Sequence, residues 1–145
     1  MLTGGLDHDQ AGCGPVQSGD CPPGPPWSFR LAGARSVRPA VELYEADALL
    51  DVVSSTPVAP QLVRGARATA GASCQRVIAW GRLPAAGGGL AVEFRGGTIR
   101  RRAAPAAVIK ITDWCWIAVA DGRFDRVVVS SGARCLQHKL TGGRR

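Results

Sequence analysis

Arginines are the residues of this chain with the clearest chemistry, because clustered positive charge suits the binding of a polyanion. The densest cluster is Arg95 with Arg100, Arg101 and Arg102. Residues 1–60 carry 7 acidic and 3 basic groups, a net of −4, whereas residues 61–145 carry 4 acidic and 15 basic groups, a net of +11. Such a split favours either an external polyanion, usually nucleic acid, or docking of the acidic half against the basic half.

Three tryptophans in the same half decide how such binding would work. Trp80, Trp114 and Trp116 stand among the basic residues, and exposed rings beside positive charge would suit single-stranded nucleic acid through base stacking and phosphate contact. The alternative is that the tryptophans form the core, as is usual in a small domain, and that the arginines are solvated surface. We predict a basic module that binds nucleic acid non-specifically, with candidate contacts from Arg76, Arg82, Arg95, Arg100, Arg101 and Arg102.

No motif in the sequence identifies a reaction or a cofactor. The cysteines at positions 13, 21, 74, 115 and 135 form no C-x2-C pair, and Cys135 with His138 would supply only half of a zinc site. Nothing in the sequence favours Cys115 and His138 as a nucleophile and its base. The glycine runs lack the phosphate-loop and dinucleotide-binding patterns. The sequence therefore predicts a non-enzymatic protein without a metal site or a cofactor.

The stretch 77–130 predicts the fold that positions these residues. It contains apolar, β-rich runs separated by turn residues, and two of the breaks, Gly96-Gly97 and Asp121-Gly122, are signals for two-residue hairpins. The first turn would place Phe94 opposite Ile99, and the second would pair the runs on either side of it. We predict a mainly β (α+β) fold, with a small antiparallel sheet or a five-stranded barrel and one preceding helix.

The run from Trp114 to Ala120 carries apolar side chains on both faces. Alternation along a strand separates two sets: Cys115, Ile117 and Val119 on one face, and Trp114, Trp116 and Ala118 on the other. A strand with two apolar faces belongs in the interior of a sheet rather than at its edge.

Residues 37–54 predict the preceding helix, which is acidic and amphipathic. Val41, Tyr44, Ala48 and Val52 recur at helical spacing, and Pro39 suits the first turn. The other segments are a disordered Gly/Pro-rich tail over 1–36, a linker over 55–73, the β domain over 74–131 and a basic flexible tail over 132–145.

Two other functions remain open from the sequence. One is a protein-interaction module or subunit that uses a sheet edge or the proline-rich stretch 22–26. The other is a frame without an evolved function, because asparagine is absent and Arg outnumbers Lys by 16 to 2, as GC-rich coding produces. No run approaches the ~18–20 apolar residues of a membrane span, and the N-terminus lacks a secretory signal. We expect a soluble, intracellular protein, cytoplasmic by default, with no membrane partner, and no small-molecule substrate is indicated.

Overall fold

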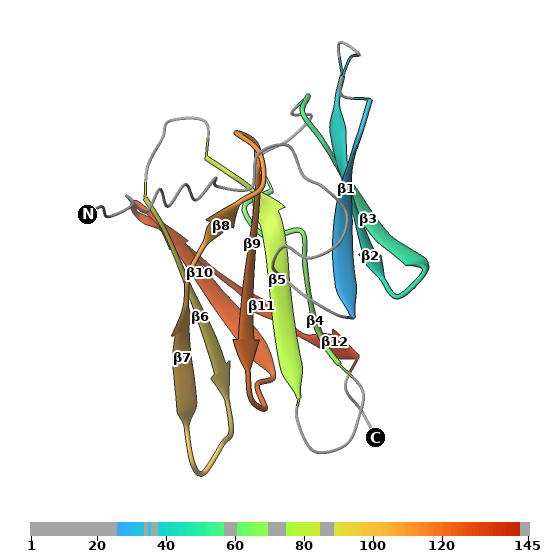
Figure 1. Ribbon diagram of the computed structural model, residues 1–145. Helices are drawn as coiled ribbons and strands as arrows, with labels where there is room; N and C mark the ends of the chain where they lie inside the picture. The colour runs from blue at the N-terminus through green and yellow to red at the C-terminus, as the bar shows by residue number, and fades with distance from the viewer. Residues whose placement is uncertain are drawn as a thin grey trace, which may run out of the picture.

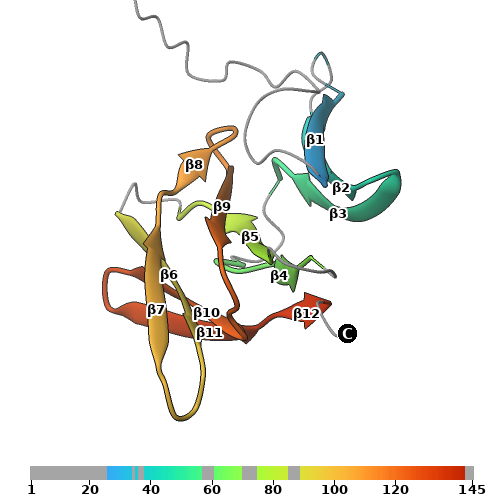
Figure 2. The same cartoon turned by 60° about the horizontal axis from the view of Figure 1, so that its bottom comes forward.

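Twelve β-strands in three sheets make up the part of the chain that this computed structural model describes, residues 26–33, 35, 38–56, 61–69, 75–84 and 89–142. Those residues contain no helix, so the mainly β prediction is confirmed and the predicted preceding helix is wrong. The sheets lie in three layers, which Figure 1 and Figure 2 show from two directions. Each sheet is open, and no five-stranded barrel closes among these residues.

The first outer layer is a three-stranded antiparallel sheet in the order β1-β2-β3. Its strands are β1 (Trp27–Ala32), β2 (Ala40–Glu45) and β3 (Ala48–Ser54). β1 lies inside the segment 1–36 that was predicted to be a disordered tail. Residues 1–25 of that segment lie outside the described residues.

The hairpin of β2 and β3 stands where the sequence predicted a helix. Val41 and Leu43, two positions apart, are both buried, which is the spacing of a strand face. Val52, a member of the helical stripe, is 41% exposed instead. The turn between the strands carries no glycine or asparagine, although Ala46 adopts a positive φ of 52°. The hairpin therefore lacked the sequence signal that would have identified it.

The middle layer is a five-stranded sheet in the order β12-β4-β5-β9-β8, in which only the β12–β4 pair runs parallel. Its strands are β4 (Gly65–Ala68), β5 (Arg76–Arg82), β8 (Ile109–Lys110), β9 (Cys115–Asp121) and β12 (Thr141–Gly142). β4 lies within the predicted linker 55–73, and β12 lies within the predicted flexible tail 132–145. The sheet therefore takes strands from outside the predicted domain limits 74–131.

The second outer layer is a four-stranded antiparallel sheet in the order β11-β10-β6-β7. Its strands are β6 (Leu90–Gly96), β7 (Arg102–Ala106), β10 (Arg126–Ser131) and β11 (Arg134–Lys139). β6 and β7 form the first predicted hairpin, but Phe94 pairs with Ala104 rather than with Ile99. The loop spans residues 97–101 rather than two residues. It folds tightly at Gly97, whose φ is 84° and where an added Cβ would lie 2.1 Å from the carbonyl oxygen of Arg100.

The second predicted hairpin does not form, because β9 and β10 belong to different sheets. Gly122 has a φ of 133°, and its N–H donates to the carbonyl oxygen of Gln75 at 2.8 Å. The N–H of Asp125 then donates to the carbonyl oxygen of Arg95 at 2.9 Å, beside β6. The glycine thus marks a crossing from the central layer to the second outer layer.

The central sheet buries both of its faces, and each face forms its own hydrophobic core. The core shared with the three-stranded sheet includes Phe29, Leu43, Ile78, Trp80 and Ile117. The core shared with the four-stranded sheet includes Val77, Phe94, Trp116, Val127 and Val129. Consecutive residues of β9 enter different cores, which confirms the prediction of an interior strand with two apolar faces. The predicted face of Trp114 is wrong, because this residue precedes β9 and packs against the first core rather than beside Trp116. The described residues include no helix long and apolar enough to cross a bilayer.

Candidate functional site

The tip of the β6–β7 hairpin gathers exposed arginines from two segments of the chain. Arg100 and Arg101 lie in the loop, and Arg102 begins β7. Arg123 comes from the crossing between β9 and β10 and lines an open hollow of about 470 Å³ together with Arg100 and Arg102. We call Arg100, Arg101, Arg102 and Arg123 the basic end.

The absence of a side chain at Gly96 allows the two segments to meet. A Cβ added there would lie 2.9 Å from the carbonyl oxygen of Arg123 and 3.0 Å from the Cα of Phe124. The crossing therefore packs its backbone directly on the end of β6. Sequence reasoning missed Arg123 because it interpreted Asp121-Gly122 as a hairpin turn, which would have placed Arg123 in a strand paired with β9.

The arginines of the basic end are exposed and stand apart from the ion pairs of the described residues. All four are exposed, and none of them takes part in an ion pair among the described residues. Arg95, on the flank of the hairpin, differs because its Nε donates to the carboxylate of Glu93. The basic end thus contains three of the six arginines that were predicted from the sequence to contact nucleic acid.

Arg76 and Arg82 lie away from the hairpin tip. Arg76 links two strands of the central sheet, and Arg82 links the central sheet to the end of β3. The Nε of Arg76 pairs with Asp121 at 3.0 Å, and its guanidinium carbon lies 6.0 Å from the ring centre of Trp27. The Nη1 of Arg82 donates to the carbonyl oxygen of Ser54, and its Nη2 donates to that of Ser55 at 3.4 Å. Neither side chain belongs to the basic end.

The tryptophans do not form a stacking surface beside the arginines. Trp80 and Trp116 are 5% and 0% exposed, which confirms the core interpretation for both, and Trp114 is partly buried against the first core. Each indole N–H has a partner, because Trp116 donates to the carbonyl oxygen of Leu62 at 2.9 Å and Trp114 donates to that of Val53 at 3.2 Å. Trp80 donates to Asp51. Base stacking on the buried pair is therefore excluded.

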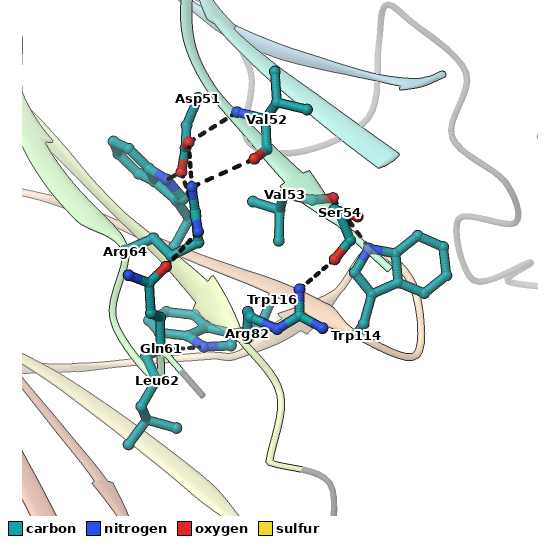
Figure 3. A network of polar contacts seen from close by, with 11 residues as sticks. Asp51, Val52, Val53, Ser54, Gln61, Leu62, Arg64, Arg82, Trp114 and Trp116 are labelled. Atoms are coloured by element: carbon teal, nitrogen blue, oxygen red, sulfur yellow. Dashed lines mark hydrogen bonds and ion pairs between the residues drawn. The ribbon is translucent and has the colours of Figure 1, made fainter. Parts of the chain in front are cut away.

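A carboxylate on β3 joins the first outer sheet to the central sheet, as Figure 3 shows. Asp51 accepts hydrogen bonds from Arg64 Nε at 2.7 Å, Arg64 Nη2 at 2.7 Å and Trp80 Nε1 at 2.8 Å. The backbone N–H of Val52 adds a fourth at 2.8 Å, and Arg64 also donates to Gln61. Burial raises the pKa of Asp51, but the bonds from Arg64, Trp80 and Val52 and the charge of Arg64 outweigh it and lower the pKa below its ordinary value.

Glu45 makes a second joint of the same kind at the far end of β2. Its two carboxylate oxygens accept from Arg67 Nε and Nη2 at 3.0 Å each, and the indole N–H of Trp27 donates to it at 3.0 Å. The bond from Arg67 lowers the pKa of Glu45 most strongly, against the opposing effect of partial burial. Asp51 and Glu45, both partly buried, are therefore structural groups held in their charged form.

The described residues include no group of three His, Cys, Asp or Glu side chains suited to a metal ion. Burial raises the pKa of the Cys115 thiol to about 12, which is unsuited to a nucleophile near neutral pH. Cys135 and His138 both lie on β11, and their odd spacing places them on opposite faces of that strand. No model of a protein family, no curated protein and no solved structure matches this chain.

Proposed function

We propose that the protein binds nucleic acid without sequence preference, through electrostatic contact between the basic end and backbone phosphates. The observation that supports this proposal is the gathering of four exposed arginines, free of acidic partners among the described residues, at the hairpin tip, where three of them line one hollow. A guanidinium presents a planar fork of donors that matches phosphate oxygens. Each phosphate neutralised also releases condensed counterions, which drives association at low salt.

The shape of the hairpin favours a duplex as the partner. The β6–β7 hairpin extends beyond the ends of the neighbouring strands, so its tip is accessible from several sides (Figure 1). The major groove of B-DNA admits a two-stranded β-ribbon. Arg100 and Arg102 line the hollow and Arg101 does not, which would let the tip contact phosphates on both sides of a groove.

Substitution of the hairpin arginines tests the proposal. The variant R100A/R101A/R102A should bind a fluorescein-labelled duplex more weakly for every sequence, and the slope of log K against log salt should become shallower by about 3. The control R30A/K110A/K139A removes the same charge from exposed sites on other strands. Fluorescence anisotropy at two salt concentrations measures both variants. Equal losses of affinity in the two variants would show that only the net charge of the protein matters. No binding at low salt would refute the proposal.

Protein interaction through a sheet edge is the alternative. The edge strand β7 contains Pro105, which cannot donate to an added strand. On β3 the carbonyl oxygens of Val52, Val53 and Ser54 already accept hydrogen bonds from side chains of other segments. Those two edges are therefore poor templates, and an edge-binding partner would use one of the other edge strands, β1, β8, β11 or β12. Its affinity should persist at high salt because apolar contact would dominate.

A further inference from the structure

A cleft opens at the end of the molecule opposite to the basic end. It lies where the ends of β3 and β5 meet the turn between β10 and β11. Ser131, which ends β10 beside that turn, pairs with Leu90 at the far end of β6 from the hairpin tip. Its volume is about 430 Å³, within the range of about 300–1,000 Å³ that small-molecule sites occupy. The residues that give it chemical character are Leu62, Arg82, Leu83, Asp113, Trp114 and Arg134.

Arg82 is the unusual member of this cleft. It is 9% exposed and is the buried charged side chain of the described residues. No carboxylate of those residues lies within ion-pair distance of it. The carbonyl oxygens of Ser54 and Ser55 take two of the five N–H donors of its guanidinium. A buried charge is normally paired with an opposite charge, so Arg82 presents beside the cleft a guanidinium whose charge no carboxylate of the described residues offsets.

The surroundings of Arg82 define what that partner would be. In Figure 3 one amino group of Arg82 turns to Ser54 and the other lies on the side of Trp114. The bond from the Trp114 indole to Val53 fixes that ring, and Leu62 and Leu83 add apolar walls. Arg134, exposed on β11, also lines the cleft, and Asp113 supplies the opposing charge. Two cations and one anion leave a net of +1, which matches a monoanion.

We propose that this cleft binds a small organic carboxylate whose aromatic or other apolar body lies against Trp114, Leu62 and Leu83. Arg82 receives the carboxylate through its remaining donors, since the fork of a guanidinium fits the two oxygens. Arg134 adds a second positive charge. This site shares no residue with the basic end, and its occupation does not depend on nucleic acid.

Protein-observed NMR with simple probes tests the site. 2-Naphthoate and phenylacetate should shift the indole N–H resonance of Trp114 in a saturable manner, whereas 2-naphthamide and inorganic phosphate should not. The first pair carries both the anion and the apolar body, and each control lacks one of them. Equal binding of the amide, or of phosphate, would overturn the proposal, as would the absence of a shift at millimolar carboxylate.

Two substitutions link binding to the named arginines. Arg134→Ala changes an exposed side chain and should weaken 2-naphthoate binding about two- to fivefold, whereas Arg30→Ala should not change it. Arg82→Lys keeps the charge but loses the fork, and should weaken binding at least about tenfold. If the Arg82 variant does not fold, the Arg134 variant still decides. An Arg134→Ala variant that binds 2-naphthoate as tightly as the wild type does would contradict the proposed position of the carboxylate in the cleft.

Discussion

At the scale of single residues, two partly buried carboxylates link separate segments of this protein. Asp51 and Glu45 each receive the fork of an arginine and the N–H of a tryptophan, and each joins the three-stranded sheet to a neighbouring segment. Removal of a partly buried carboxylate would leave its arginine and indole donors without an acceptor, which costs more than the pair itself contributes.

Acid should destabilise the protein through these two carboxylates. A carboxylate whose folded pKa is lowered stabilises the fold above its unfolded pKa, about 3.9 for Asp and 4.3 for Glu, and loses that contribution as the pH falls through the folded pKa. The free energy of unfolding from urea titration should therefore fall steadily below about pH 4.5. Asp51→Asn should lower stability at pH 7 by about 2 kcal/mol and flatten the acid slope.

Asp47→Asn serves as the matched control, because Asp47 is exposed in the turn after β2. It should leave both the stability at pH 7 and the acid slope close to those of the wild type. A parallel loss of stability in wild type and Asp51→Asn between pH 5 and pH 3 would show that Asp51 does not carry the acid sensitivity.

At the scale of elements, a glycine sets how closely β4 and β5 pack. Gly65 pairs with Trp80 across the two strands, and a Cβ added at Gly65 would lie 2.4 Å from the indole carbon Cζ2. The ring therefore lies over the backbone of β4, and its N–H reaches Asp51 from there. Any side chain at position 65 would displace the ring and break that bond.

Gly65→Ala should accordingly reduce the free energy of unfolding by about 1–3 kcal/mol, the range for overpacking a close-packed core. Gly89→Ala is the control, because a Cβ added at Gly89 meets nothing within 4 Å. Chemical denaturation followed by tryptophan fluorescence measures both variants. Equal stabilities for the two would mean that the Trp80 ring moves aside without cost.

Sequence patterns predicted the elements whose burial follows a simple alternation and missed those that depend on distant contacts. β5, β6, β9 and β10 overlap with the apolar runs predicted in the stretch 77–130, because their apolar residues are continuous or alternate. β4 is a short Gly-Ala-Arg-Ala strand with no apolar signal of its own, and β12 is equally short. Of the candidate site, the consecutive arginines were predictable, but Arg123 and the cleft around Arg82 depend on how the layers cross.

At the scale of the whole molecule, two cores share the central sheet, and each core is completed by a different outer sheet. The first core needs β1 to β3, and the second needs β6 and β10. No buried side-chain N or O atom of the described residues lacks a hydrogen-bond partner. A sequence without an evolved structure would leave many such groups unsatisfied.

The full chain should therefore unfold in one cooperative transition, while the fragment 74–131 should show none. The fragment lacks the three-stranded sheet, which covers Ile78 and Ile117 of the central sheet, and it lacks β4, which pairs with β5. Calorimetry of both chains, with dye binding to detect exposed apolar surface, measures the difference. A cooperative transition in the fragment would restore the domain limits predicted from the sequence, and the lack of one in the full chain would favour a frame without an evolved function.

The central sheet also has a consequence for how fast the protein reaches its native state. Its contacts join residues far apart in the chain: Arg76 and Asp121 are separated by 45 positions, and Thr141 and Ala66 by 75. Closing such long loops costs chain entropy before the stabilising contacts form. All-β proteins dominated by non-local pairs therefore fold in about milliseconds to seconds. During that interval the apolar faces of β5 and β9 remain uncovered, so the unpaired central strands are the segments through which newly made copies of this chain would associate wrongly.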